Sequence, residues 1–418
     1  TGASSTMVST SSQHFALFGR FVHGVDATQP GVLAHIDCGC IVVHNGVITH
    51  IATTKEQVGT LLKKLPQDVN RVWLSPTQLC HPGMIDTHIH APQYQFTGTA
   101  TRLPLLAWLQ MYTFPAEMRC EDTQFAAGLY KKLVRKLLSH GTTMAVMYGS
   151  IHLEATKTLV DVCLALGQRA IVGKVAMDQH GAVGYQETLE TSLEDTEAFI
   201  LYCYSQQPNT TAEERLVNPA VTPRFIPTCS TKLLQGLGDL VAKYHTQGCW
   251  VQSHIAESLD EMQFVASLHN NRRDTHIFHH HGLLTDRTIM AHGVHLTNDE
   301  LVVLASTGAG IACCPLSNAF FADGEYKLKH AHLFGVNTGL GTDVAGGYSC
   351  SLLSSCRHAV CSSKVVARLA HNITDRCENV CDEADEFTNV ANDDDDDDVD
   401  DDDDVVVDDG VDDGTNKS

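Results

Sequence analysis

The sequence predicts an α/β protein built on a (β/α)8 TIM-like barrel, because short apolar runs alternate with amphipathic segments from Pro82 onward. Segments such as Phe125–Leu138 and Lys232–Tyr244 repeat apolar residues at helical spacing. A doubly wound sheet produces the same alternation, so the strand count favours the barrel without excluding that alternative. The candidate strands are Met84–His90, Thr142–Tyr148, Ala170–Met177, Val221–Ile226, Trp250–His254, Thr288–His292, Gly308–Cys313 and Thr338–Asp343.

Residues 14–81 predict a small β domain ahead of the barrel, which we place at residues 82–370. Short β-rich runs follow one another over residues 14–53, and Asn45-Gly46 between two of them is a hairpin signal. Residues 1–13 are expected to be disordered. Within the barrel, Thr297 and Glu300 have the spacing of a capping box and predict the start of a helix.

The acidic balance of the chain is concentrated in one segment. Residues 381–418 hold 19 of the 50 acidic side chains and one of the 28 basic ones. Residues 1–380 therefore carry 31 acidic and 27 basic residues, a net charge of −4, which excludes the basic surface of a nucleic-acid binder. Because like charges repel and leave nothing to bury, residues 371–418 predict a disordered acidic tail.

Cysteine usage and hydropathy indicate a cytoplasmic protein. The 15 cysteines show no paired spacing beyond Cys38-Gly-Cys40 and adjacent Cys313-Cys314, a pattern typical of free thiols in a reducing compartment. No apolar run has the length of a membrane span, and the first residues do not resemble a secretory signal.

The strongest chemical signal is the run Pro82-Gly-Met-Ile-Asp-Thr-His-Ile-His90. Residues two apart on a strand point to the same side, so His88 and His90 should project together from the carboxyl end of the first barrel strand. Barrel enzymes build their sites at that end. The plainer interpretation is an alternating strand that carries two surface histidines. The residues before the pair favour the other interpretation, in which His88 and His90 are two of the ligands of a zinc ion.

Further ligand-type residues lie at the ends of later candidate strands. His254 closes the fifth, His292 closes the sixth, and Asp343 closes the eighth. Any one of them alone is more often a buried histidine or a turn-capping aspartate, but strand ends of one barrel converge. His88, His90, His254 and Asp343 are therefore the predicted ligands of one Zn2+ per chain. Glu257, three residues past a ligand, is placed to carry a proton, and His292 to stabilise the attacking oxygen.

Several other chemistries are disfavoured because their motifs are absent. The chain has no His-Glu-x-x-His of zinc proteases and no His-x-Glu with Pro-Cys-x-x-Cys of cytidine-type deaminases. It also lacks a three-glycine dinucleotide loop and a Gly-x-Ser-x-Gly elbow.

The motifs resemble the amidohydrolase superfamily, and the flanking residues resemble the guanine deaminase family within it. The resemblance covers roughly residues 15–366; the histidine motif is shared by the whole superfamily, whereas the tryptophan and Thr-Phe-Pro-Ala-Glu strings are narrower. The matching strings are His90-Ala-Pro-Gln-Tyr94, Leu103-Pro-Leu-Leu-Ala-Trp108, Tyr112-Thr-Phe-Pro-Ala-Glu117, Val221-Thr-Pro-Arg-Phe225 and Gly339-Leu-Gly-Thr-Asp-Val-Ala-Gly-Gly-Tyr348.

The resemblance implies zinc-dependent deamination of guanine to xanthine and ammonia, and a homodimer. It implies Glu257 as the proton shuttle, Asp343 as the general base, and Gln93, Arg224 and Phe225 as the residues that hold the purine. Without the resemblance, Arg224 reads as a surface ion pair and Phe225 as a core residue. The substrate-binding set expected on this basis is His90, Ala91, Pro92, Gln93, Arg224, Phe225, His254, Glu257 and Asp343.

Two alternatives stay open at this point. One is a related amidohydrolase acting on another nitrogen heterocycle, against which Gln93 and Arg224 argue. The other is a truncated, non-catalytic binding protein, because family members complete a small β-sandwich with a C-terminal segment. Here a helix is expected from after Gly347 to about Ala367, with the acidic tail beyond it. We therefore expect the small β domain to be incomplete.

Overall fold

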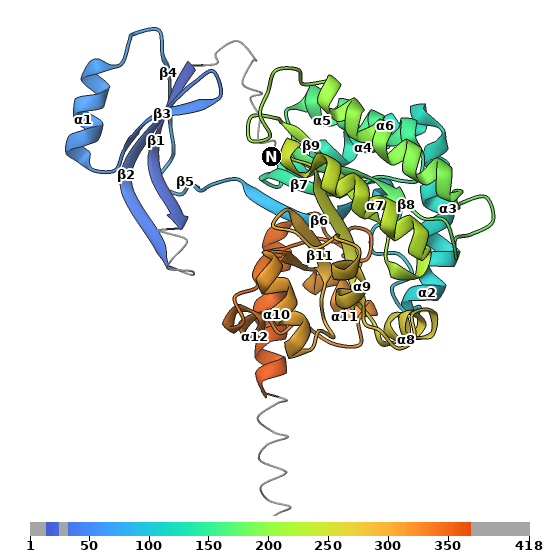
Figure 1. Cartoon of the computed structure of the whole chain (residues 1–418). Coiled ribbons are helices and arrows are strands. Elements are labelled where there is room, and N and C mark those ends of the chain that lie inside the picture. The colour runs from blue at the N-terminus through green and yellow to red at the C-terminus, as the bar shows by residue number, and fades with distance from the viewer. Residues whose placement is uncertain (1–13, 25–31, 369–418) are drawn as a thin grey trace, which may run out of the picture. The chain divides into compact units, whose positions relative to one another are not determined.

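The computed structural model describes residues 14–24 and 32–368 (Figure 1). The N-terminus expected to be disordered and the acidic tail lie outside the described residues. The chain divides into two compact units, Thr1–Ser363 and Lys364–Ser418, and every strand named below belongs to the first.

Eight parallel strands form one continuous sheet in the order in which they occur in the sequence, from β6 to β13. Helices α4, α5, α6 and α7 lie along the outer side of these strands (Figure 1). The predicted barrel is confirmed, and the alternative of a doubly wound sheet is wrong, because strand order never reverses. The strands are β6 Met84–His90, β7 Thr142–Tyr148, β8 Arg169–Ala176, β9 Val217–Pro223, β10 Trp250–Ile255, β11 Thr288–His292, β12 Gly310–Cys313 and β13 Asn337–Leu340.

The first and last strands are joined at the carboxyl end of the barrel. The amide of Asp343, just past β13, donates to the carbonyl of His88 at 2.9 Å, and the amide of His90 donates to the carbonyl of Val344 at 3.1 Å. Gly339 on β13 faces Thr87 on β6 so closely that an added Cβ would lie within the threonine side chain. The lack of a side chain at Gly339 therefore permits the two strands to approach.

Three barrel strands have the predicted bounds, and the largest departure is β9. The sequence predicts Val221–Ile226, whereas the strand runs from Val217 to Pro223. Within this strand Pro219 has no backbone N–H to donate to a ladder. In the structure Pro219 lies opposite Val172 in the parallel pairing with β8, and all seven residues of β9 are buried.

The helices outside the strands bury one apolar stripe each. In α4 the buried residues include Leu129, Leu133 and Leu137, which lie one turn apart, and Asp122 caps the helix by accepting from the amides of Gln124 and Phe125. The predicted capping box of Thr297 and Glu300 is confirmed at the start of α10. The helices are α2 Leu105–Trp108, α3 Phe114–Met118, α4 Thr123–Ser139, α5 Leu153–Leu166, α6 Leu189–Ser205, α7 Thr231–Tyr244, α8 Leu259–Leu268, α9 Asp274–His280, α10 Asn298–Thr307, α11 Pro315–Phe321 and α12 Leu328–Leu333, with a further helix over 352–368.

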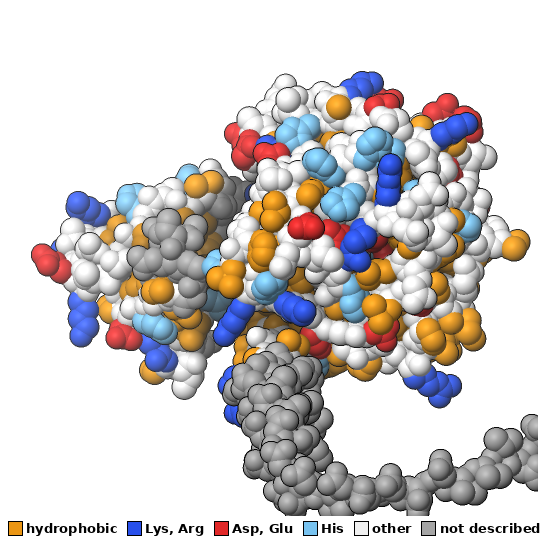
Figure 2. All heavy atoms as spheres, turned by 60° about the horizontal axis from the view of Figure 1, so that its bottom comes forward, with side chains coloured by type: hydrophobic (Ala, Val, Ile, Leu, Met, Phe, Trp, Pro, Cys, Tyr) orange, Lys and Arg blue, Asp and Glu red, His pale blue; other side chains and the backbone are white. Residues whose placement is uncertain are grey.

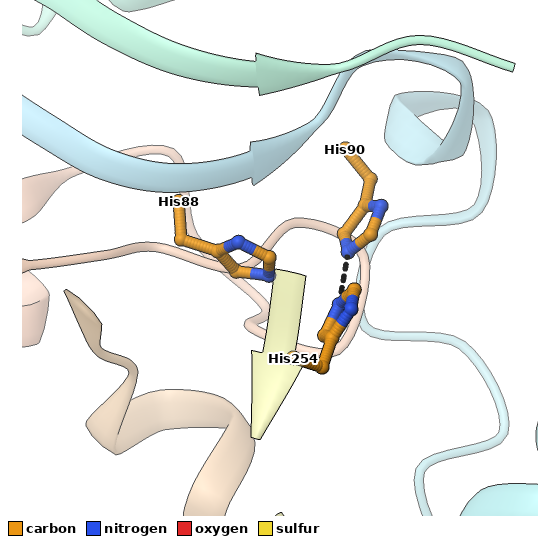
Figure 3. A group of neighbouring side chains, drawn as sticks. All are labelled: His88, His90 and His254. Carbon is orange, nitrogen blue, oxygen red and sulfur yellow. Dashed lines mark hydrogen bonds between the residues drawn. The ribbon is translucent and has the colours of Figure 1, made fainter. Parts of the chain in front are cut away.

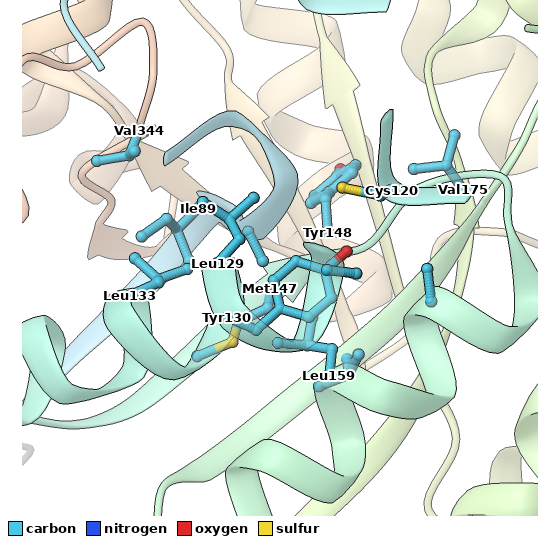
Figure 4. Close-up of a cluster of buried hydrophobic side chains, with 14 of the residues drawn as sticks. Ile89, Cys120, Leu129, Tyr130, Leu133, Met147, Tyr148, Leu159, Val175 and Val344 are labelled. Carbon is cyan, nitrogen blue, oxygen red and sulfur yellow. The ribbon is translucent and has the colours of Figure 1, made fainter. Parts of the chain in front are cut away.

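The barrel core continues from the strands into the helical layer. Ile89 of β6, Met147 of β7, Tyr130 of α4 and Leu159 of α5 belong to one cluster of buried side chains (Figure 4). The core thus fixes the strands whose ends carry the candidate site.

The small domain is a five-stranded sheet with one helix against it. The hairpin predicted at Asn45-Gly46 is confirmed, since β2 and β3 pair in antiparallel fashion on either side of it. The sequence did not predict the helix, which packs Val58 on Phe18 and Val42, or the two short strands that follow it. The elements are β1 His14–Gly24, β2 Leu33–His44, β3 Val47–Ala52, α1 Lys55–Lys64, β4 Asn70–Trp73 and β5 Leu79–Cys80.

The surface is mixed in character. On the face shown in Figure 2, Lys and Arg side chains lie singly among acidic and hydrophobic ones and form no large basic patch. Every cysteine within the described ranges is a free thiol. No helix among the described residues has the length and hydropathy needed to cross a membrane.

The barrel interior should be sensitive to a methyl group at Gly173 on β8. A Cβ there would overlap the hydroxyl of Thr222 and lie 2.7 Å from the amide nitrogen of Gln252. We expect Gly173→Ala to lower the free energy of unfolding by about 1–3 kcal/mol, as overpacking of a core does. Thermal unfolding measures the effect. Gly128→Ala is the matched control because Gly128 lies in α4 with open space around it, and alanine should stabilise that helix by up to ~1 kcal/mol. Equal melting temperatures for both variants would contradict this account.

The small domain should exchange its amide hydrogens faster than the barrel. Its helix covers one face of the sheet, while Ile48 and Ile51 of β3 are 53% and 67% exposed. A thin sheet with few buried contacts opens locally at low free-energy cost. Hydrogen exchange followed by mass spectrometry should show faster exchange across Phe15–Ile51 than across β8 to β11. Uniformly slow exchange in a monomeric sample would contradict this expectation.

Candidate active site

The predicted ligand residues come from three parts of the barrel and meet at its carboxyl end. His88 and His90 lie on β6, where the strand alternation turns both inward. His254 lies near the end of β10. Asp343 lies three residues past β13 and is held beside His88 by the backbone bond that joins the two strands. All four side chains are buried.

The imidazoles of His88, His90 and His254 point toward one another (Figure 3). The Nε2 atoms of His90 and His254 are 3.1 Å apart. His88 Nε2 lies 3.0 Å from Asp343 Oδ1, and His90 Nε2 lies 3.5 Å from the same oxygen. One ligand atom from each of the three histidines can be chosen so that all lie within 4.8 Å.

This arrangement fits a metal ion better than it fits a network of hydrogen bonds. His88 Nε2 is buried and makes no well-directed hydrogen bond in spite of its short distance to Asp343. Two ring nitrogens at 3.1 Å leave at least one lone pair facing another unless a proton or a cation lies between them. Imidazole nitrogens and a carboxylate oxygen are the donor set that zinc prefers.

The surroundings keep the three imidazoles neutral, which is the form that ligates a metal. Burial lowers the pKa of His254 and of His90 well below the usual value, and protonation of His88 would lower both further. Burial also lowers the pKa of His88, although Asp343 opposes it. The Nδ1 atom of His254 donates to the carbonyl oxygen of Arg224 at 2.6 Å, which leaves the Nε2 lone pair for the cluster.

Asp86 supports the cluster from the same strand. Its carboxylate accepts from the backbone amide of Thr342 at 3.0 Å, from the Thr342 hydroxyl at 2.5 Å and from the amide of His88 at 3.3 Å. Burial raises the pKa of Asp86 to about 6, against the effect of these bonds. Asp86 therefore fixes the segment that carries Asp343 relative to β6.

Glu257 and His292 lie beside Asp343. His292 Nε2 is 3.5 Å from Glu257 Oε1 and 4.0 Å from Asp343 Oδ2, and its Nδ1 lies 3.0 Å from the side-chain oxygen of Asn318. Burial raises the pKa of Glu257 well above the ordinary range, and the charge of Asp343 raises it further. A carboxylate with a raised pKa accepts a proton more readily than an ordinary one and can then donate it, which suits Glu257 to general acid–base chemistry.

The backbone at this end of the barrel is held in an unusual conformation. Ala256, His292 and Asp343 all have positive φ, at 46°, 73° and 45°. Such angles cost non-glycine residues free energy and persist only where the surroundings impose them. Here Asp274 accepts from the amide of Ala256 at 3.0 Å, and Glu261 accepts from the amide of Glu257 at 2.8 Å.

A cavity opens beside the cluster, and most of the predicted substrate-binding residues line it. Of that set, Ala91 and Pro92 do not line the cavity, because they are buried in the 3-10 turn Ala91–Phe96 that follows β6. Apolar side chains from α2, α11 and the π-helical turn Leu109–Thr113 complete most of its wall. The lining residues are His90, Gln93, Leu105, Trp108, Leu109, Arg224, Phe225, His254, Glu257, His292, Ser317, Phe321 and Asp343.

Without the family resemblance, Arg224 was expected in a surface ion pair and Phe225 in the core, and the structure differs from each expectation in one respect. Arg224 is not at the surface: it is 2% exposed and pairs with Glu117 at 2.7 Å. Phe225 is buried as a core residue would be, yet it also lines the cavity.

Sequence reasoning assigned no role to Glu117, Tyr185 or Asn318. Glu117 ends one of the family strings, which was the available signal. Tyr185 and Asn318 gave none, because a tyrosine in a loop and an asparagine in a short helix are ordinary features.

Comparison with known proteins is consistent with this geometry. The model of the amidohydrolase family matches residues 79–380. A guanine deaminase of Dictyostelium discoideum is 36% identical over 82% of this chain and 76% of its own length. The guanine deaminase of Homo sapiens is 42% identical over 70% of this chain, but the match spans only 63% of that protein.

A solved structure extends the likeness to three dimensions. The guanine deaminase from C. acetobutylicum with bound guanine in the active site has a TM-score of 0.76 and 30% identity, over 86% of this chain and 81% of that one. Taken together, the family match and these relatives show that the chain belongs to the amidohydrolase family and, within it, to the guanine deaminases.

Proposed function

We propose that this chain catalyses the zinc-dependent hydrolysis of guanine to xanthine and ammonia. The observation that carries the proposal is the convergence of three buried imidazoles and Asp343 beside a cavity that Arg224, Phe225 and Glu257 line. The C. acetobutylicum relative, which is described with guanine in its active site, supports guanine as the substrate.

One zinc ion per chain would be held by His88, His90, His254 and Asp343. When bound, zinc makes a water molecule acidic enough to act as a nucleophile near neutral pH. The residues supply the rest of the site: the Arg224 carbonyl orients the imidazole of His254, and Asp86 fixes the segment that carries Asp343.

The purine would lie against Gln93, Arg224 and Phe225. An amide and a guanidinium can pair with the fixed row of donors and acceptors on the edge of guanine, while an aromatic ring covers its face. The apolar wall provided by Leu105, Trp108 and its neighbours would exclude bulk water from the ring.

The reaction forms a bond from the oxygen of water to C2 of guanine and breaks the bond from C2 to the exocyclic nitrogen. Glu257 would take a proton from the water and deliver it to that nitrogen, which leaves as ammonia. His292 would hydrogen-bond the incoming oxygen, and Asp343 would act as the second proton acceptor. The cytoplasmic location and the homodimer that the resemblance implies remain predictions.

Replacement of Glu257 by glutamine should abolish most turnover without loss of the metal. The amide keeps the shape of the side chain but cannot carry a proton, so the rate should fall by ~10²–10⁴. The decrease in guanine absorbance as xanthine forms measures the rate, and elemental analysis measures zinc. Glu154→Gln, which alters an exposed carboxylate on α5, is the matched control and should keep the parental rate.

A near-parental rate for Glu257→Gln would remove Glu257 from the proposed mechanism. A parental chain that is active on cytosine or a triazine but not on guanine would contradict the substrate assignment instead.

Removal of one ligand should release the metal. We expect His88→Ala to weaken zinc binding by more than the ~10–100-fold that loss of an outer-shell partner costs. Zinc content after dialysis against a chelator gives the measurement. His280→Ala, an exposed histidine on α9, serves as control and should retain zinc. A full equivalent of zinc in His88→Ala would overturn the ligand assignment.

A further inference from the structure

Glu117 is a charged residue that does not line the cavity but contacts two residues that do. It lies on α3, and its side chain is completely buried. The proposed reaction has no step for it. Burying a carboxylate costs free energy of folding unless its oxygens are fully hydrogen-bonded. The role of Glu117 can therefore be inferred from the groups that donate to it.

Glu117 accepts four hydrogen bonds from three residues, and both of its carboxylate oxygens take part. Oε1 accepts from Gln93 Nε2 at 2.8 Å and from Arg224 Nη2 at 3.1 Å. Oε2 accepts from Arg224 Nη1 at 2.7 Å and from the Tyr185 hydroxyl at 2.6 Å. A carboxylate offers about four acceptor positions, so this one is saturated.

Two hydrogen bonds fix the orientation of the Gln93 side-chain amide, which lines the cavity. Its Nε2 donates to Glu117, and its Oε1 accepts from the backbone amide of Ala345 at 3.2 Å. An amide rotated by half a turn would direct its nitrogen at a backbone N–H and its oxygen at a carboxylate. The side chain therefore has one stable orientation.

The same carboxylate fixes Arg224 and balances its charge. The guanidinium binds Glu117 through two nitrogens and lies 5.0 Å from the ring of Phe114. A two-point contact of this kind sets both position and plane. Burial lowers the pKa of Arg224, but the charge of Glu117, its hydrogen bonds and two nearby tyrosines together outweigh burial and raise the pKa. A guanidinium paired with a carboxylate has no net charge.

We propose that Glu117 is a positioning residue that aligns Gln93 and Arg224 and makes their edge of the cavity neutral, so that it accepts an uncharged purine and disfavours an anionic one. The inference rests on the proposed function. The relevant anion is the product: xanthine loses a ring proton more readily than guanine, because two carbonyl groups share the negative charge. Because the cavity edge formed by Gln93, Arg224 and Glu117 has no net positive charge, it does not retain the xanthine anion by charge attraction.

The test is Glu117→Gln, with steady-state kinetics at a pH where xanthine is anionic. The variant loses the acceptor for Gln93 and leaves Arg224 without a counter-charge. We expect the KM for guanine to rise about tenfold or more, which is the scale of a lost charge-assisted hydrogen bond, and kcat to change much less. Inhibition by xanthine should strengthen relative to guanine binding, so that the ratio of Ki for xanthine to KM for guanine falls by at least about tenfold.

Two further variants separate this role from simple stabilisation of the fold. Glu187→Gln is the matched control: it also removes a buried carboxylate, the partner of Lys174 on β8, but Glu187 contacts neither Gln93 nor Arg224. It should lower stability and leave the ratio of Ki to KM unchanged. Tyr185→Phe removes one bond to Glu117 and keeps the charge. It should raise KM a few-fold without changing that ratio, and it provides the test if Glu117→Gln does not fold.

The outcomes distinguish the two proposals. A parental protein that binds zinc but leaves guanine unchanged would overturn the proposed function. A parental protein that deaminates guanine, together with a folded Glu117→Gln of unchanged KM and unchanged ratio, would overturn only the role of Glu117. A fall in kcat with loss of zinc and no change in KM would also overturn it.

Discussion

The site depends on the contact between the first and last strands of the barrel. Two backbone hydrogen bonds join β6 to residues 343 and 344, and one of them runs from the amide of Asp343 to the carbonyl of His88. That bond brings a carboxylate more than 250 residues away to within 3.0 Å of an imidazole. Gly339 and Asp86 make this contact possible. Gly339 leaves room for the side chain of Thr87, and the carboxylate of Asp86 accepts from both the backbone amide and the hydroxyl of Thr342.

Ion pairing and burial set the charge states of the side chains at the centre of the barrel. The three imidazoles are neutral because burial lowers their pKa values. Arg224, which is fully charged, has Glu117 as its counter-ion. Glu257 alone has a strongly raised pKa among the carboxylates that line the cavity, since burial and the charge of Asp343 act in the same direction. These different environments give chemically similar groups different tasks.

The loops that carry Glu257 and His292 hold conformations that cost free energy. Ala256 and His292 have positive φ, at ~1–3 kcal/mol each. The carboxylates of Asp274 and Glu261 accept from the backbone amides of Ala256 and Glu257, and these bonds offset the cost at Ala256. Neither carboxylate lines the cavity. The residues that hold the site in place thus include side chains that would not contact the substrate. A large, well-packed barrel provides these supporting residues.

The sequence by itself favoured the barrel over a doubly wound sheet and identified most of the residues that converge in it, whereas the strand order decided between the two folds. Alternation along a strand is a local property, so the positions of His88 and His90 on one side of β6 follow from residue order. The positions of His254, His292 and Asp343 at or shortly after the ends of later strands also follow from local patterns, although the exact strand ends differ from those predicted. The acidic segment and the hairpin at Asn45-Gly46 are equally local. Family strings, rather than periodicity, supplied Gln93, Arg224 and Phe225.

Only the tertiary structure decided what those residues touch. From the sequence, Glu117 is one acidic residue in a short helix, and only the folded chain brings Arg224 next to it. The surface ion pair that the sequence suggested for Arg224 is a buried one. The extent of β9 was also decided by pairing, because its residues from Val217 onward, including Pro219, lie opposite residues of β8. Sequence patterns report which side of an element is apolar. They do not report partners, because distances between residues far apart in the chain are set by packing.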